Sequence, residues 1–225
     1  MKIDIKGAII PNDDKWLYDY FCMDSTCPKQ VTDSITQANG QRLEVYINSG
    51  GGSIFAGAEI YGALEAYPGE VKIHVVGSAC SAASVIACAG KSDMVRTGMF
   101  MYHNVSGSAS GDYHDMDKSS AVLQTANRAI CAAYVYKTGK SETELLADMD
   151  AETWLTAEQA VKKGFIDSIA ENQNLPLVAG IGGIIPQSVL NKIRAESGKV
   201  HCDIAKQKAQ AALDLLTIKN MEEQA

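Results

Sequence analysis

Apolar and polar residues alternate in two stretches near the start of the chain. MKIDIKGAII alternates at Ile3 and Ile5, with Ala8 as a further candidate, and RLEVYIN alternates at Leu43, Val45 and Ile47. This period of two predicts a strand in each. Between them, KQVTDSITQANG (residues 29–40) has apolar residues at helical spacing and a glycine at its end. It therefore predicts a helix.

The alternation of strands and helices continues through the first half of the chain. After three glycines, IFAGAEIYGALEAY (54–67) has a helical pattern, and VKIHVV (71–76) is typical of a strand. The small-residue stretch GSACSAASVIACAG (77–90) follows as a turn, with a helix expected over 84–89, and then DMVR and MFMYH as two short strands. Strands that alternate with helices predict βαβ crossovers and a largely parallel sheet.

The pattern changes after residue 111. Residues 112–139 predict one helix on the order of 40 Å long, which would protrude or pack on another subunit. Ser141 with Glu144, and Thr156 with Gln159, have the capping-box spacing that begins a helix.

The rest of the chain divides into a domain and a tail. Phe165, Ile166 and Ile169 predict a last strand near residue 170, so an α/β domain is expected over residues 1–172. Glycine and proline then indicate a linker over 173–187, and two further helical patterns predict a C-terminal appendage over 188–225.

Composition narrows the class of protein. The chain has 46% hydrophobic and 21% charged residues and a net charge of −7. An acidic chain without clustered Lys and Arg argues against nucleic acid as a partner. No segment approaches the ~18 apolar residues of a membrane span, and the N-terminal residues contain no apolar stretch long enough for a signal peptide, so we expect a cytoplasmic protein. The six cysteines lack metal-site spacing, and neither a metal nor another cofactor is expected.

The loop INSGGGS is the first candidate site. It has a strand, three glycines at 50–52 and then the start of a helix, an arrangement that points backbone N–H groups toward an anion. Neither G-x-G-x-x-G nor a lysine after the last glycine is present, so an oxyanion fits this loop better than a phosphate. A plain strand-to-helix turn is the alternative.

The small-residue stretch is the second candidate site. Ser81 is expected at or near the N-terminus of the helix that follows, where negative charge on its oxygen is favoured, among small neighbours that let a substrate approach. The alternative is that Ser78 or Ser81 merely caps the helix. The G-x-S-x-G elbow of α/β-hydrolases is absent.

A nucleophilic serine needs a base and a carboxylate. Of the four histidines, His103 ends a strand and opens a Gly/Ser loop, from which it could reach a neighbouring strand end. His103 is therefore the best base by elimination. Asp148, Asp150 and Glu152 precede Trp154, which we expect to be buried, and the pattern does not choose among these carboxylates.

Four motifs together resemble the Clp-type serine protease proteolytic subunits, in order over residues 2 to 170. LEVYINSGGGSIFAGAEIYGAL resembles their INSPGG segment and its helix. GSACSAASVIACAG resembles their G-x-A-A-S-M-G/A stretch, in which the serine is the nucleophile, and this implies Ser81. MFMYHNVSG resembles the strand that ends in the catalytic histidine, which implies His103. ETWLTAEQAVKKGFIDSI resembles the region of the third triad residue, which implies Glu152, with Asp150 as the weaker alternative.

This resemblance implies a fold and an activity. The fold would be ClpP/crotonase-like, a repeated ββα superhelix with the long helix as a handle. The protein would be a serine endopeptidase acting on polypeptides, with an oxyanion hole at Gly51, Gly52 and Ala82, in a homo-oligomeric ring or double ring. The segments IDIKGAII, NDDKW and ETWLTA resemble most the phage and prophage branch of the family, the head maturation (prohead) proteases. Capsid or scaffold precursors would then be the substrate, inside the prohead.

The departures from the family leave alternatives open. Glu152 replaces the usual Asp, and Gly50 replaces a proline. The chain begins almost at the first strand, without the segment that forms axial loops, which disfavours an AAA+ unfoldase as partner and general ATP-dependent proteolysis as function. A crotonase-like acyl-CoA enzyme and a non-catalytic ring subunit of a phage assembly are the alternatives from other classes, and self-cleavage of the tail is a further expectation.

Overall fold

The computed structural model describes residues 1–171, 189–191 and 193. The chain divides into two compact units, Met1–Gly183 and Ile184–Ala225, and the candidate site lies in the first. The predicted linker, and all of the predicted appendage except residues 189–191 and 193, which are helical, lie outside the described residues.

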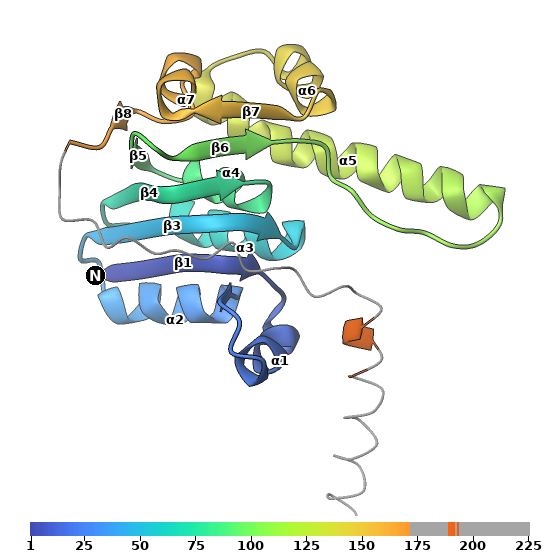
Figure 1. The fold of residues 1–225 in the computed structure, drawn as a ribbon, viewed down its shortest axis with the longest axis horizontal. Coiled ribbons are helices and arrows are strands. Elements are labelled where there is room, and N and C mark those ends of the chain that lie inside the picture. The colour runs from blue at the N-terminus through green and yellow to red at the C-terminus, as the bar shows by residue number, and fades with distance from the viewer. Residues whose placement is uncertain (172–188, 192, 194–225) are drawn as a thin grey trace, which may run out of the picture. The chain divides into compact units, whose positions relative to one another are not determined.

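The first unit is a mixed α/β structure built on a mostly parallel sheet (Figure 1). Its elements in chain order are β1 (Lys2–Ile9), a 3-10 turn (Asn12–Asp14), α1 (Lys15–Tyr20), β2 (Ser25–Thr26), α2 (Pro28–Ala38), β3 (Leu43–Gly52), α3 (Ile54–Glu65), β4 (Val71–Cys80), α4 (Ala82–Ala87), β5 (Lys91–Met94), β6 (Met99–Tyr102), α5 (Tyr113–Thr138), α6 (Glu142–Asp150), β7 (Thr153–Thr156), α7 (Ala157–Lys163) and β8 (Ser168–Ile169).

The sheet places the ends of three strands side by side. Within the described residues its order is β2-β1-β3-β4-β5-β8, and β6 pairs with the second half of β4. All of these pairs are parallel, whereas β7 runs antiparallel to β6. Because β3, β4 and β6 are parallel neighbours, the loops that follow them meet at one edge of the sheet.

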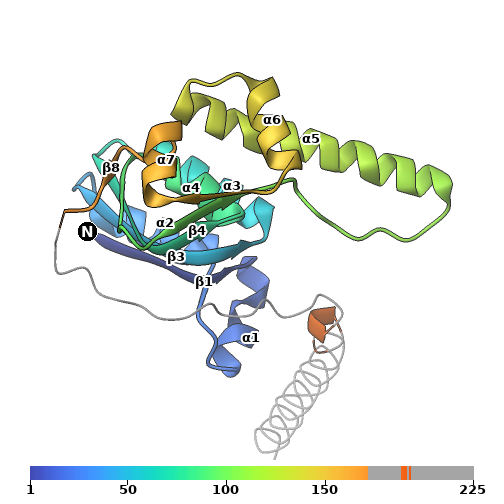
Figure 2. The same cartoon turned by 45° about the horizontal axis from the view of Figure 1, so that its top comes forward.

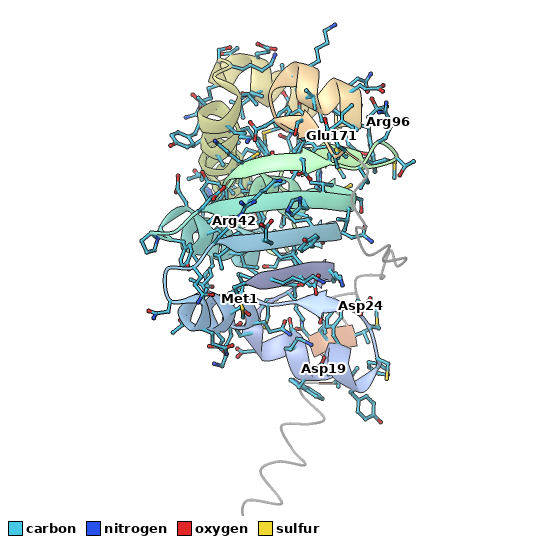
Figure 3. All side chains as sticks on the ribbon, turned by 90° about the vertical axis from the view of Figure 1, so that its left-hand side faces the viewer. Met1, Asp19, Asp24, Arg42, Arg96 and Glu171 are labelled. Carbon is cyan, nitrogen blue, oxygen red and sulfur yellow. The ribbon has the colours of Figure 1, made fainter. Side chains whose placement is uncertain are left out.

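The two faces of the sheet differ in chemistry. Helices α2, α3 and α4 cover one face (Figure 2), where alternate residues such as Ile5 and Val45 join the buried core. The other face carries the intervening polar residues. At its N-terminal edge the amino group of Met1 donates to Arg42 O at 2.6 Å, and Arg42 forms an ion pair with Glu44 (Figure 3).

Helix α5 is the long helix that the sequence predicts. Asp112 caps it and Gly139 ends it in the left-handed conformation. Its buried residues, Ile130, Cys131, Ala133 and Tyr134, all lie in its second half, while its first half extends past the sheet (Figure 1). The helix therefore has an anchored end and a projecting end.

Five local predictions need correction. The residues Gly77–Cys80 belong to β4 rather than to a turn, and α4 begins at Ala82 instead of residue 84. Helix α1 and strand β7 form where neither was expected. Trp154 is 52% exposed, contrary to the prediction that it is buried; within the described residues its strand pairs only with β6.

Candidate active site

Ser81 occupies a strained turn between β4 and α4. Its backbone has φ 54° and ψ −125°, a region that costs a residue with a side chain about 1–3 kcal/mol and that clusters at functional sites. Its N–H donates to Met101 O in β6 at 2.9 Å, which fixes the turn against the neighbouring strand. The sharp strand-to-helix turn presents the Ser81 hydroxyl at the sheet edge, as the elbow of α/β-hydrolases does, although its glycine motif is absent.

Small residues allow two turns to meet at Ser81. Gly51 has φ +94°, and a Cβ there would lie 2.7 Å from Ser81 Cβ and 2.6 Å from Cys80 O. A Cβ at Gly52 would lie 2.1 Å from Ile9 O in β1. The β3–α3 turn thus fits between β1 and the Ser81 turn only with glycine at these positions. Gly50 has open space around it, which is consistent with the proline that the family has there.

His103 lies beside Ser81. It follows β6, whose pairing with β4 puts Met101 opposite Cys80, so the next residues of both strands emerge together. His103 Nε2 is 2.9 Å from Ser81 Oγ, within the range of a nucleophile–base hydrogen bond. Both residues are partly exposed, so a substrate can reach them. The structure brings together the two residues that the sequence singled out.

The carboxylates do not complete this arrangement. Glu152 Oε1 accepts a hydrogen bond from Trp154 Nε1 at 3.1 Å, and Asp150 Oδ1 accepts one from Asn104 Nδ2 at 2.7 Å. Asp148 accepts from Tyr102 and Lys163, each at 2.6 Å. Among the described residues no carboxylate is hydrogen-bonded to His103.

The register of β6 and β7 nevertheless distinguishes these carboxylates. Tyr102 pairs with Thr153 in this antiparallel ladder. Glu152 directly precedes Thr153 and His103 directly follows Tyr102, so Glu152 is the carboxylate at this end of the ladder, and its φ of 49° places it outside the strand. Asp148 instead accepts hydrogen bonds from Tyr102 of β6 and from Lys163. Burial opposes the ionisation of Asp148, but these hydrogen bonds outweigh burial and lower its pKa.

The glycine loop and α4 supply the candidate oxyanion donors. Gly51 N–H donates to Ser49 Oγ at 3.0 Å, and Ser49 Oγ donates to Gly7 O, so the role of Gly51 is to shape the loop. In the sheet beside Gly52, Ser53 N–H is the donor to Ile9 O. Ala82 begins α4, and the first N–H groups of a helix have no intrahelical acceptor. Gly52 and Ala82 therefore remain the candidate N–H donors to an oxyanion.

The other nucleophilic side chains near Ser81 are hydrogen-bonded to other groups or buried. Ser78 donates to Asn48 Oδ1 at 3.2 Å, and Ser84 Oγ donates to Ser81 O at 2.6 Å. Cys80 is buried, and burial raises the pKa of its thiol to about 11, so the thiol stays protonated at neutral pH. The hydroxyls of Ser78 and Ser84 therefore have structural partners.

Two contacts around His103 were not foreseen. Asn127 Oδ1 in α5 accepts from Val105 N–H at 2.6 Å, and Asn127 Nδ2 donates to Asn104 Oδ1 at 2.9 Å. These partners are more than 20 residues apart in the chain, so no local pattern links them. Their only sequence signal is that Asn104 follows the candidate base.

A hydrogen-bonded serine and histidine at adjacent strand ends, next to a glycine turn, define a site of the serine hydrolase kind. Comparison with known proteins agrees with this class. The Clp protease family model matches residues 27–173, more than half of the chain, and the chain belongs to the Clp protease family. The match begins in front of α2, so β1 and α1 lie before it.

Individual relatives of the chain are proteolytic subunits of ATP-dependent Clp proteases. The chain is 31% identical over 133 residues to an ATP-dependent Clp protease proteolytic subunit of Bacteroides fragilis, a match that covers 58% of this chain and 64% of that one. It is 32% identical over 133 residues to subunit 1 of Streptomyces avermitilis, covering 58% and 61%. With subunit 1 of Leifsonia xyli it shares 31% over 147 residues, covering 64% and 74%. The chain thus spans less than two thirds of the length of the first two relatives.

Proposed function

We propose that this protein is a serine endopeptidase of the Clp proteolytic-subunit type. The observation that carries the proposal is the 2.9 Å contact between Ser81 Oγ and His103 Nε2 at a strained turn, in a chain that belongs to the Clp protease family. Ser81 Oγ attacks the scissile carbonyl while His103 takes the hydroxyl proton, and His103 then returns a proton to the leaving amine.

Glu152 is the proposed third residue of the triad. Its place at the end of the β6–β7 ladder, next to the Tyr102–Thr153 pair that His103 follows, favours it, whereas Asp150 Oδ1 already accepts from Asn104. To reach His103 Nδ1, Glu152 exchanges its exposed bond with Trp154 for one with the imidazole. There it holds the tautomer with a free Nε2 and stabilises the imidazolium that forms.

The tetrahedral intermediate places negative charge on the former carbonyl oxygen. Gly52 and Ala82 N–H groups are the proposed donors to it, and Gly51 keeps their two loops in contact. Loss of one such donor typically costs ~10²–10³ in rate. No metal or cofactor takes part in the proposed reaction.

The proposed biological role is processing of capsid or scaffold precursors in phage head maturation, in the host cytoplasm or the prohead interior. The resemblance of IDIKGAII, NDDKW and ETWLTA to the prohead branch supports it. In the part of the chain that the structure describes, no helix is long and apolar enough to cross a membrane. The proposed assembly is a homo-oligomeric ring or double ring in which the projecting half of α5 forms the contact between rings.

General ATP-dependent proteolysis with an unfoldase is the second candidate. The names of the relatives favour it, because each is an ATP-dependent Clp protease proteolytic subunit. The two roles differ in what they require: maturation cuts a precursor at defined sites without ATP, whereas general proteolysis degrades unfolded protein with an ATPase.

One incubation separates these candidates. Wild-type protein and Ser81→Ala are incubated with a candidate capsid precursor and, separately, with casein, and the products are mapped by mass spectrometry. Cleavage of the precursor at a few sites by the wild type alone supports maturation. Degradation of casein that needs an added AAA+ partner supports the general role. Absence of any Ser81-dependent cleavage contradicts the endopeptidase proposal and favours a non-catalytic ring subunit.

A further inference from the structure

The residues on both sides of His103 are held by side chains, while His103 itself has a single partner. Tyr102 Oη before it donates to Asp148 at 2.6 Å. Asn104 and Val105 after it are both bonded to Asn127. The imidazole bonds only to Ser81 within the described residues. Its direction in this structure is therefore imposed through the backbone that carries it.

Asn127 forms a two-pronged contact with the segment after His103. Its Oδ1 accepts from Val105 N–H at 2.6 Å, and its Nδ2 donates to Asn104 Oδ1 at 2.9 Å. Asn127 lies on the same side of α5 as Ile130, Cys131 and Tyr134, which anchor that half of the helix in the core. The contact thus joins the loop after the base to a fixed part of α5.

Asn104 extends the contact to a third element. Its Oδ1 is the acceptor for Asn127, and its Nδ2 donates to Asp150 Oδ1 at the end of α6 at 2.7 Å. The three side chains form one directed chain, in which Asp150 accepts from Asn104 and Asn104 accepts from Asn127. Both amides are fixed in orientation, because turning either one would place like groups against each other.

We propose that Asn127 is a positioning residue for the reaction, which fixes the backbone of residues 104–105 and so aims His103 at Ser81. Asn104 and Asp150 complete the contact. The inference rests on the proposed function, since it gives Asn127 its role through His103. Displacement of a catalytic group by about 1 Å can cost ~10²-fold in rate, so the effect falls on the chemical step and not on binding.

The rate of acylation of Ser81 by a fluorophosphonate probe measures the effect of Asn127 on the chemical step directly. We expect Asn127→Ala to lower the maximal acylation rate about tenfold to a hundredfold, while the probe concentration at half-maximal rate stays within about twofold of wild type. Gln124→Ala is the matched control on the same helix, since among the residues that the structure describes its amide bonds only to Ser120. Thermal unfolding and light scattering confirm that each variant is folded and assembled like the wild type.

A reversed pair of substitutions tests the hydrogen-bond chain itself. In Asn127→Asp, an oxygen replaces the donor to Asn104, and one contact in the chain becomes repulsive. Adding Asp150→Asn lets the side-chain bonds run the other way: the carboxylate introduced at position 127 accepts from Val105 and Asn104, and Asn104 accepts from the amide introduced at position 150. We expect the double variant to recover the rate to within about threefold of wild type, as coupled sites do.

The outcomes decide between the alternatives. A reduced rate in Asn127→Ala and Asn127→Asp, with recovery in the double variant, supports the proposal. An unchanged rate in folded Asn127→Ala, or no recovery in the double variant, overturns it. Failure of the proposed function is distinguishable, because then the wild type itself is not acylated or Ser81→Ala is acylated equally.

Discussion

Gly51 and Ser81 are in such close contact that a Cβ on Gly51 would lie 2.7 Å from Ser81 Cβ. The contact joins the turn after β3 to the turn after β4, and it sets the position of the proposed oxyanion donors relative to the proposed nucleophile. Small residues in the stretch 77–90 therefore serve close packing of two turns as well as access for a substrate.

Gly51→Ala is expected to damage both stability and activity. The added methyl overlaps Cys80 O, and φ +94° is strained for alanine, so we expect a loss of about 1–3 kcal/mol in the free energy of unfolding and at least a tenfold lower acylation rate, on the order of the effect of misplaced groups. Denaturant unfolding and probe acylation measure the two effects. Gly62→Ala, in the middle of α3 with open space around it, should instead gain about 0.5–1 kcal/mol. Equal behaviour of the two variants would contradict this account.

Ser84→Ala is expected to cost stability while Ser81 remains reactive. Tyr134 Oη lies 2.7 Å from Ser84 Oγ, and both residues are fully buried. Removing the Ser84 hydroxyl leaves the phenol without its partner, at a cost of about 1–3 kcal/mol. Adding Tyr134→Phe removes the orphaned group, so the double variant should lose less than the sum of the two single losses. Strict additivity in denaturant unfolding would show that the pair is not coupled.

Cys80 is expected to be unreactive although it precedes the nucleophile. Burial raises the pKa of its thiol to about 11, so little thiolate forms at pH 7.5. Iodoacetamide should modify exposed Cys22 in the native protein and leave Cys80 unmodified until unfolding, as peptide mapping can show. Cys80→Ala should still be acylated by the probe, and loss of acylation in a folded Cys80→Ala would reopen the choice of nucleophile.

The stability of the sheet should depend on pH through His74. Its ring nitrogens contact Asp93 Oδ1 in β5 at 2.7 Å and Glu44 Oε2 in β3 at 2.6 Å. Lys72, which is on β4 like His74, forms an ion pair with Asp93, and Tyr46 stacks on the imidazole ring. Burial alone would lower the pKa of His74, but these hydrogen bonds outweigh it and raise the pKa above 6.5. The protonated ring is thus favoured in the folded protein.

The sign of the pH effect follows from the raised pKa. A group whose pKa is higher folded than unfolded contributes its full stability below the unfolded pKa of 6.5 and loses it as the pH rises through the folded value. Against His74→Gln, the wild type should therefore show its largest advantage in unfolding free energy near pH 5.5–6, and a smaller one at pH 9. An advantage that grows toward pH 9 would contradict a protonated His74.

Much of the fold follows from local patterns. Strands β1 and β3 alternate between buried and more exposed residues in their first halves, and helix α5 has a cap at each end, so these periods and ends are encoded locally. Ser81 and His103 were found because both follow predicted parallel strands, whose ends meet at one edge of a sheet.

The remaining features depend on tertiary contacts. Gly77–Cys80 have weak strand propensity, yet they are a strand because β3 and β6 supply partners on both sides. Trp154 is apolar enough for a core, but its strand is bordered only by β6 among the described residues. The bond of Asp150 to Asn104 depends on where α6 ends relative to the loop after His103, which no short-range pattern determines.

The most direct test of the central claim is the site of covalent modification by a fluorophosphonate. The protein is treated with the probe, its mass is measured intact, and the modified peptide is sequenced by tandem mass spectrometry, for the wild type, Ser81→Ala and His103→Ala. A Ser81 nucleophile activated by His103 predicts one adduct per chain on Ser81, none in Ser81→Ala, and acylation slowed about 10²–10⁴-fold in His103→Ala. An adduct on another residue, or undiminished labelling of Ser81→Ala, would contradict it.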